Sequence, residues 1–167
     1  MSSNVTGYST LQVALHWVVV VLVAFQFLAH DEIEASWRAF RDMEPASGTA
    51  APLAYAHIAA GILVLILAMA RIYLRASRGA PPPPADEPRI LQLVAEAVHG
   101  AIYILLLLIP LSGIVAWFFG IDDAGDAHEL LTSLLLVAIA LHVAGALFQH
   151  FVRRSGVLMR MFKPQRG

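Results

Sequence analysis

Four long apolar segments dominate this chain and limit what it can fold into. Hydrophobic residues make up 59% of the 167 residues and charged residues only 14%, whereas about a quarter of a soluble domain is charged. Each segment approaches or exceeds the roughly 20 helical residues that cross a bilayer. Backbone groups in lipid must satisfy one another, so we expect helices. The predicted spans cover residues 11–29, 53–74, 91–119 and 127–152.

The connections between these segments are short, which places consecutive helices antiparallel to each other. We therefore predict an all-α membrane protein, an up-down-up-down bundle of four transmembrane helices in a single domain over residues 1–167. The connection 75–90 contains four consecutive prolines at 81–84. These cannot be helical and are expected to run extended as a stiff polyproline II connector.

The charges are distributed unequally between the two ends of the predicted bundle. The connections 30–52 and 120–126 contain two of the eleven basic residues, Arg38 and Arg41, against eight acidic ones. The other nine basic residues lie at the end of the second span, in 75–90 or in the tail 153–167. The positive-inside rule then predicts an inner-membrane protein with both termini in the cytoplasm. The basic, partly apolar tail is expected to lie against the anionic inner leaflet.

Several classes of site and partner are disfavoured by composition. The chain has no cysteine, which excludes disulfides, thiolate zinc sites and iron–sulfur clusters. A net charge of −1 argues against a nucleic-acid partner.

Seven histidines lie in or at the edges of the four spans, where this residue is scarce. One such ring would ordinarily bond to a neighbouring helix, but seven favour ligands of a metal. Apart from Glu96 near the start of the third span, no carboxylate or thiolate lies within a buried run to complete a zinc site. Imidazole alone can hold haem iron from both axial sides. The histidines are His16, His30, His57, His99, His128, His142 and His150.

The spacing of two histidines in the fourth span predicts two haems. His128 and His142 are fourteen residues apart, which is about 21 Å of helix and about 40° short of four full turns. They therefore share a face at two depths, too far apart for one haem. Gly61, Gly100 and Gly145 lie near histidines, where they suit either a flat macrocycle or ordinary helix packing.

The partners of these two histidines can be chosen by depth. For the inner haem, His142 is matched in depth by His16 and by His99, and depth alone leaves both open. For the outer haem, His128 is matched by His57 and by His30. His30 directly precedes "DEIE" at the water boundary, so we favour His57.

Several stretches resemble the bacterial cytochrome b561 family of small, four-span, dihaem inner-membrane proteins. The resemblance covers nearly the whole chain, and the histidine set is its most specific part. The stretches are "LQVALHW", "AHIAAGILVLILAMARIYLR", "HGAIYILLLLIPLSG", "HELLTSLLLVAIALHVAGALFQH" and "LMRMF".

The resemblance implies a set of roles for these residues. His16 and His142 would be the axial ligands of the inner haem b, and His57 and His128 those of the outer haem b. The position of His99 and the end of the fourth span would belong to a quinone site. One branch of the family resembles a superoxide oxidase, which takes electrons from periplasmic superoxide, releases oxygen and reduces ubiquinone.

The chain departs from the family pattern near the end of the fourth span. Adjacent histidines are expected there, but this chain has Gln149 followed by His150. Glutamine can donate a hydrogen bond to a quinone carbonyl but cannot supply a proton. His150 is a possible substitute, and either residue could be the quinone contact.

Two charged residues could serve the inner site. Arg71 lies fourteen residues after His57, which places it on much the same face at the inner depth. It would pair with a haem propionate or line the quinone site, or it would snorkel to the interface. Glu96, one turn before His99, would relay protons to the quinone or simply face solvent.

On the outer side, Arg38 and Arg41 could offset the repulsion of superoxide by the acidic connections. This requires their segment, with Trp37, to fold over the outer haem.

Three functions are compatible with the sequence. The leading one is a dihaem b-type cytochrome that transfers electrons across the membrane to ubiquinone, with superoxide as the donor. The alternative is a membrane subunit that relays electrons between a periplasmic redox partner and the quinone pool. A metal or haem transporter is disfavoured because the histidines fall at paired depths.

Overall fold

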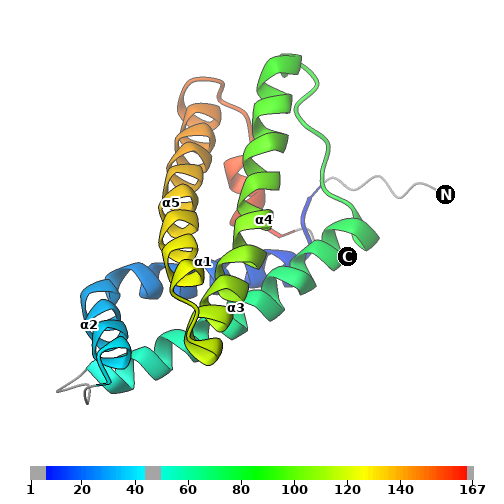
Figure 1. Cartoon of the computed structure of the whole chain (residues 1–167). Coiled ribbons are helices and arrows are strands. Elements are labelled where there is room, and N and C mark those ends of the chain that lie inside the picture. Colours follow the sequence, from blue (N-terminus) through cyan, green and yellow to red (C-terminus); the bar gives the residue numbers. More distant parts are fainter. Residues whose placement is uncertain (1–6, 44–49, 165–167) are drawn as a thin grey trace.

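The computed structural model describes residues 7–43 and 50–164, and the regular elements of these residues are helices. Four of them are long and apolar enough, by length and composition, to cross a membrane, which confirms the predicted all-α fold with four spans. The elements are α1 (Thr10–Leu28), α2 (His30–Arg41), α3 (Ala50–Arg78), α4 (Arg89–Phe119), α5 (Asp122–Phe151) and the short 3-10 helix η1 (Leu158–Met161) (Figure 1).

The helix ends follow local signals as well as hydropathy. Before α1, the Ser9 hydroxyl accepts a hydrogen bond from the Gln12 backbone N–H at 3.3 Å, and the Gln12 side chain accepts one from the Ser9 backbone. This capping box satisfies two N–H groups that the helix leaves free. Gly120 ends α4 in the left-handed conformation, with φ 64°, which glycine adopts without a Cβ clash. Helix α5 begins at Asp122, earlier than the apolar segment predicted, because the helix also includes the polar residues before that segment. Helix α3 begins at Ala50, three residues before its predicted start.

Helix α2 was missed by the sequence analysis, which treated residues 30–52 as a connecting loop. Its apolar residues Ile33, Trp37 and Phe40 recur at i, i+4 and i+7, which is the spacing of one helical face. The remaining positions are largely charged, so hydropathy alone does not detect this helix.

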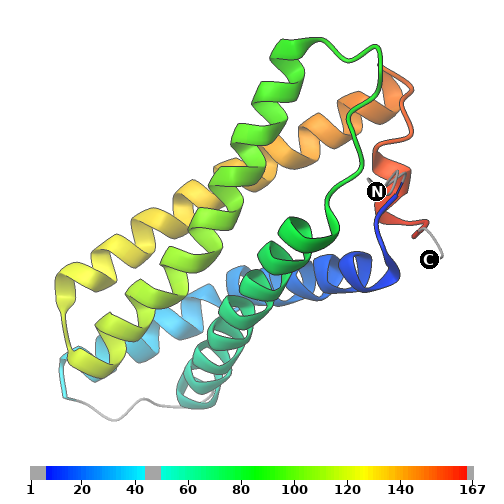
Figure 2. The same cartoon turned by 90° about the vertical axis from the view of Figure 1, so that its right-hand side faces the viewer.

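Helices α4 and α5 form a close antiparallel hairpin, α3 packs against α4, and α1 packs against α3. Helices α4 and α5 lie side by side in both views (Figures 1 and 2). Helix α3 packs against α1, α2 and α4. All four long helices contribute to one small buried cluster, made of Val19, Val64, Ala68, Leu105, Leu106, Leu135 and Ala138.

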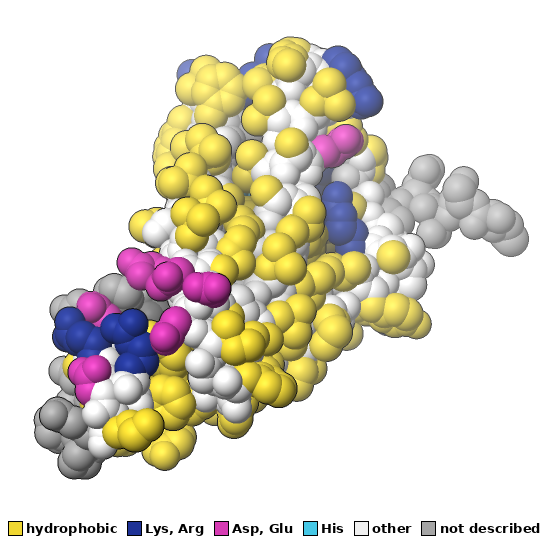
Figure 3. All heavy atoms as spheres, in the orientation of Figure 1, with side chains coloured by type: hydrophobic (Ala, Val, Ile, Leu, Met, Phe, Trp, Pro, Cys, Tyr) yellow, Lys and Arg dark blue, Asp and Glu magenta, His cyan; other side chains and the backbone are white. Residues whose placement is uncertain are grey.

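Most other large apolar side chains on these helices are exposed. Hydrophobic side chains cover much of the α4–α5 face, and charged ones gather towards its ends (Figure 3). An outward apolar surface of this kind is what lipid requires of a spanning bundle.

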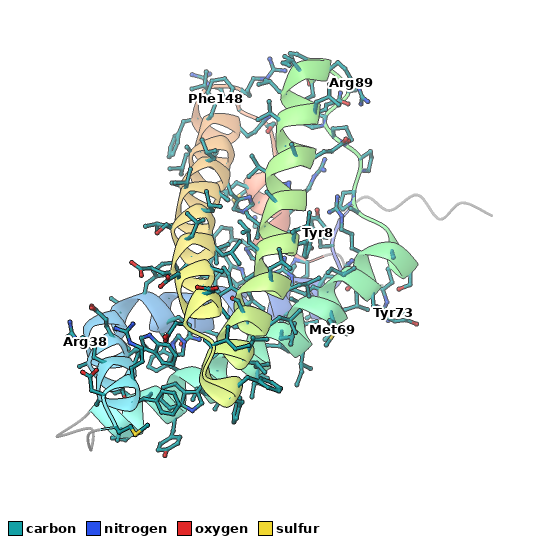
Figure 4. The ribbon with its side chains drawn as sticks, viewed as in Figure 1. Tyr8, Arg38, Met69, Tyr73, Arg89 and Phe148 are labelled. Atoms are coloured by element: carbon teal, nitrogen blue, oxygen red, sulfur yellow. The ribbon has the colours of Figure 1, made fainter. Side chains whose placement is uncertain are left out.

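The molecule has two ends of different character. One, here called the tail end, contains residues 75–92 and 149–164, with Arg89 and Phe148 marking it in Figure 4. The other, here called the α2 end, contains α2 and the α4–α5 turn, with Arg38 marking it.

At the tail end, the proline connector is tied to the C-terminal residues. Arg160 donates a hydrogen bond to the Pro82 carbonyl at 2.7 Å, and the Gln12 amide donates to the Gly79 carbonyl at 3.2 Å. The Trp17 indole donates to the Met161 carbonyl at 2.8 Å. These contacts hold the connector and η1 against the ends of the spans.

Candidate functional site

Helix α5 carries one histidine of each of two pairs. His142 faces His16 of α1, with ring centroids 6.3 Å apart and planes at 61°. His128 faces His57 of α3, with centroids 6.0 Å apart and planes at 68°. We call these the tail-end pair and the α2-end pair. The structure thus brings together the histidines that sequence spacing and resemblance had matched.

The spacing within each pair fits a shared iron. An imidazole nitrogen lies about 2 Å from a metal it binds, and its ring centroid about 1 Å further, so two axial rings have centroids about 6 Å apart. Both observed distances agree with this value. In addition, Nδ1 of His16 is buried and has no hydrogen-bond partner among the described residues. A buried polar atom without a partner is uncommon. The ring spacing of both pairs, with this atom at the tail-end pair, therefore fits haem iron held by histidine.

His99 lies beside the tail-end pair rather than across from it. Its ring centroid is 4.9 Å from that of His142, with planes at 78°, which is too short for an iron between the two rings. Its Nδ1 lies 2.6 Å from the Ala95 carbonyl, so Nδ1 carries the hydrogen and donates it. Of the two partners that depth left open for His142, the geometry favours His16.

The remaining histidines are less informative. The side chain of His30, the alternative outer ligand, lies outside the described residues. His150 is half-buried and packs edge-on against Phe151, with ring centroids 4.8 Å apart.

The ring of His128 is held by a backbone group of α4. Its Nδ1 donates to the Ile109 carbonyl at 2.8 Å. The Ser112 hydroxyl donates to the same carbonyl at 2.8 Å and lies 3.3 Å from Nδ1. A Cβ added at Gly113 would lie 3.0 Å from Cε1 of His128, so a larger residue there would require the ring to shift by a few tenths of an ångström. These contacts were not predicted, although "IPLSG" within an apolar helix is a signal for them.

Arg71 lies at the tail-end pair, as its spacing from His57 predicted. It is half-buried, and its guanidinium carbon is 5.7 Å from the centroid of the Tyr103 ring. Tyr103 follows His99 by one turn of α4. The charge of Arg71 acts on His16, His99 and His142. A contact inside the bundle favours a role at the site over snorkelling.

Gln149 lies in a polar cluster at the tail end. Its amide donates to Oε1 of Glu87 at 2.6 Å and accepts a hydrogen bond from the Ser155 hydroxyl at 2.8 Å. Arg153 donates a hydrogen bond to the Asp86 backbone carbonyl at 2.9 Å and lies 3.7 Å from the second carboxylate oxygen of Glu87. The Glu87 side chain is only 3% exposed. This buried carboxylate was not predicted, because an acidic residue in a connection between helices is usually solvated.

Glu96, the proposed proton relay, is exposed on α4. Its position is compatible with both roles that the sequence left open.

At the α2 end, an aromatic cluster attaches α2 to the α4–α5 hairpin. Phe40 stacks on Trp117 of α4 with centroids 4.8 Å apart, and Trp37 lies 5.5 Å from Phe40. A Cβ added at Gly125 would be 3.2 Å from Trp37, and Gly125 precedes His128 by one turn. The segment therefore does fold over this end of the bundle. Arg38 forms an exposed ion pair with Glu34 at 3.0 Å.

Paired histidines at two depths of an apolar helical bundle define a membrane cytochrome of the b type. The chain matches the family described as prokaryotic cytochrome b561 over residues 7–164. It therefore belongs to this family of membrane electron carriers, whose membership implies haem b.

Three named relatives cover almost the whole chain. It is 32% identical to cytochrome b562 of Cereibacter sphaeroides, over 95% of this chain and 97% of that protein. It is 31% identical to a probable superoxide oxidase, CybB, of Yersinia pestis, over 96% and 98%. It is 27% identical to cytochrome b561 homolog 1 of Escherichia coli, over 92% and 96%.

Proposed function

We propose that this cytochrome holds two haems b and transfers electrons across the inner membrane from superoxide to ubiquinone. The observation that carries the proposal is that α5 carries one histidine of each of two pairs, whose other members lie on α1 and α3. Along α5 their members are about 21 Å apart, which is most of a hydrocarbon core about 30 Å thick. Each haem supplies one-electron chemistry when bound, and the chain determines where that chemistry occurs.

The proposed axial ligands are the members of the two pairs. His16 and His142 would hold one haem towards the tail end, and His57 and His128 the other towards the α2 end. Arg71 would pair with a propionate of the first haem or line the quinone site beside it.

The proposed orientation places the tail end in the cytoplasm. Basic residues concentrate there, and positive charge is retained on the cytoplasmic side. Exposed Asp122, Asp123 and Asp126 lie at the opposite end, which would face the periplasm. Arg41, which lies 5.9 Å over the Trp37 ring, would offset part of this negative charge.

The proposed quinone site lies beside the tail-end pair. Reduction of a quinone requires two electrons and two protons. Neutral His99 has its one N–H committed to Ala95, so Nε2 can donate only after the ring takes up a proton. Imidazole suits this role because its ordinary pKa is near neutrality. Exposed Glu96 would supply that proton from the cytoplasm, while Gln149 and His150 are the further candidates for contact with the quinone.

The donor is proposed from the name of the Yersinia pestis relative. Each superoxide would give one electron and leave as dioxygen, so two are consumed for each quinone reduced. The test is to expose the purified protein to superoxide and ubiquinone without any other protein. Superoxide-dependent quinone reduction above the uncatalysed rate is expected, and a rate equal to that of protein lacking haem would contradict the proposal.

The acidic α2 end favours a second candidate, a subunit that accepts electrons from a basic periplasmic protein. Under this alternative, the purified chain would reduce quinone only after that partner is added. The same experiment therefore separates the two functions.

A further inference from the structure

The two histidine pairs differ in the hydrogen-bond partners and charges that surround their imidazole rings. In the α2-end pair, Nδ1 of His128 donates to the Ile109 carbonyl at 2.8 Å. In the tail-end pair, Nδ1 of His16 is buried without a hydrogen-bond partner among the described residues. Arg71 supplies a positive charge to the tail-end pair.

The bond to Ile109 changes His128 as a ligand. A carbonyl can only accept, so the hydrogen is on Nδ1 and the lone pair that binds metal is on Nε2. Drawing the Nδ1 hydrogen towards an acceptor makes Nε2 more basic. A more basic ligand stabilises the oxidised, more positive iron, and hydrogen bonding of this kind is one of the means by which proteins lower a haem potential.

Arg71 has the opposite effect at the tail-end pair. A fixed positive charge in a low-dielectric bundle disfavours the more positive, oxidised form of a nearby group. Its guanidinium is held inside the bundle by the contact with Tyr103, 5.7 Å away. A haem between His16 and His142 is therefore more easily reduced.

We propose that the Ile109 carbonyl and Arg71 together set the direction of electron transfer. They make the α2-end pair the site of lower reduction potential and the tail-end pair the site of higher potential. One electron then passes from the α2 end to the tail end without a proton and without any bond being made or broken. Gly113 is the positioning residue, because a Cβ there would lie 3.0 Å from the His128 ring and would require the ring to shift by a few tenths of an ångström from its place at the carbonyl. The inference rests on the two-haem part of the proposed function.

The test is a redox titration of the purified protein, followed by absorbance, without superoxide or quinone. Two midpoint potentials are expected. The His57→Ala variant removes the α2-end haem and so assigns the remaining potential to the tail-end pair, which should be the higher of the two. A wild-type protein in which the tail-end pair has the lower potential overturns the inference. One haem per chain would instead refute the proposed function.

Variants at Gly113 and at Arg71 test the contribution of the Ile109 carbonyl and that of the Arg71 charge separately. Gly113→Ala should push the His128 ring from the carbonyl and raise only the lower potential. A tenfold loss in the equilibrium constant between the sites corresponds to about 59 mV for one electron. Gly100→Ala is the matched control, because it lies on the same helix and its Cβ would meet nothing within 4 Å. It should leave the lower potential unchanged.

Arg71→Gln should lower only the higher potential. Arg71→Lys keeps the positive charge, so it should lower that potential much less. If Gly113→Ala loses the α2-end haem, the inference is still tested by the order of the two wild-type potentials and by the Arg71 variants. An unchanged higher potential in Arg71→Gln, or an unchanged lower one in haem-loaded Gly113→Ala, contradicts the corresponding half of the inference.

Discussion

The α2-end pair and the tail-end pair share helix α5, yet they lie in different surroundings. His128 is fixed by a backbone carbonyl, and α2 attaches to the helices beside it through aromatic contacts. The tail-end pair lies beside a third histidine and an arginine, with a buried carboxylate further along the same end. In the proposed function, the first arrangement would serve electron transfer alone. The second also contains groups that can exchange protons, as a quinone site requires.

The largest expected effect is the loss of one haem from either pair without loss of the other. His142→Ala should remove the tail-end haem and His128→Ala the α2-end haem, because an axial bond holds each iron. Haem-to-protein ratios of purified variants measure this. His30→Ala is the matched control and should retain both haems. Loss of a haem from His30→Ala would assign the outer ligand to His30 in place of His57.

The next effect separates proton chemistry from haem binding. His99→Ala should leave both haems in place and slow quinone reduction by about 10²–10⁴, the usual contribution of a general acid or base. The rate is measured with reduced protein mixed with ubiquinone. His150→Ala and Gln149→Ala serve for comparison, and a larger loss in either would move the proton donor to the end of α5.

A smaller effect is expected on stability at the tail end. Arg153→Ala leaves the buried Glu87 carboxylate without its nearby cation and should cost roughly 1–3 kcal/mol. Glu87→Gln can still accept from Gln149, so adding it should restore part of the loss. Thermal denaturation of the haem-loaded protein in detergent measures both. Additive losses in the double variant would show that the two residues are not coupled.

The smallest effect concerns the attachment of α2. Gly125→Ala places a Cβ 3.2 Å from Trp37, which should loosen α2 by less than about 1 kcal/mol. Faster hydrogen exchange of the α2 amides would report this. Gly145→Ala is the matched control on the same helix. It gains the same helix propensity, but its added Cβ meets nothing within 4 Å. Equal exchange in the two variants would show that Gly125 does not position Trp37.

The features that were predicted from the sequence are those that produce a periodic or recurring pattern of residue types. The four spans followed from unbroken apolar runs. The two depths of the histidines on α5 followed from a fourteen-residue interval and His57 from depth, whereas His16 was chosen over His99 only by the family resemblance. Helix α2 was missed because it is short and largely charged, so its one apolar face at Ile33, Trp37 and Phe40 was hidden by its composition.

Other features depend on contacts between distant segments. The Ile109 carbonyl is a backbone group, and no residue type at position 109 marks it as the partner of His128. Glu87 is buried only because the end of α5 and Arg153 cover it. Such contacts become visible only when the helices are placed in space.

The central claim is that each histidine pair holds one iron, and an iron anomalous difference map of the haem-loaded protein tests it most directly. Two peaks are predicted, one between His16 and His142 and the other between His57 and His128. A single peak, a peak between His99 and His142, or one bound by His30 would contradict the account.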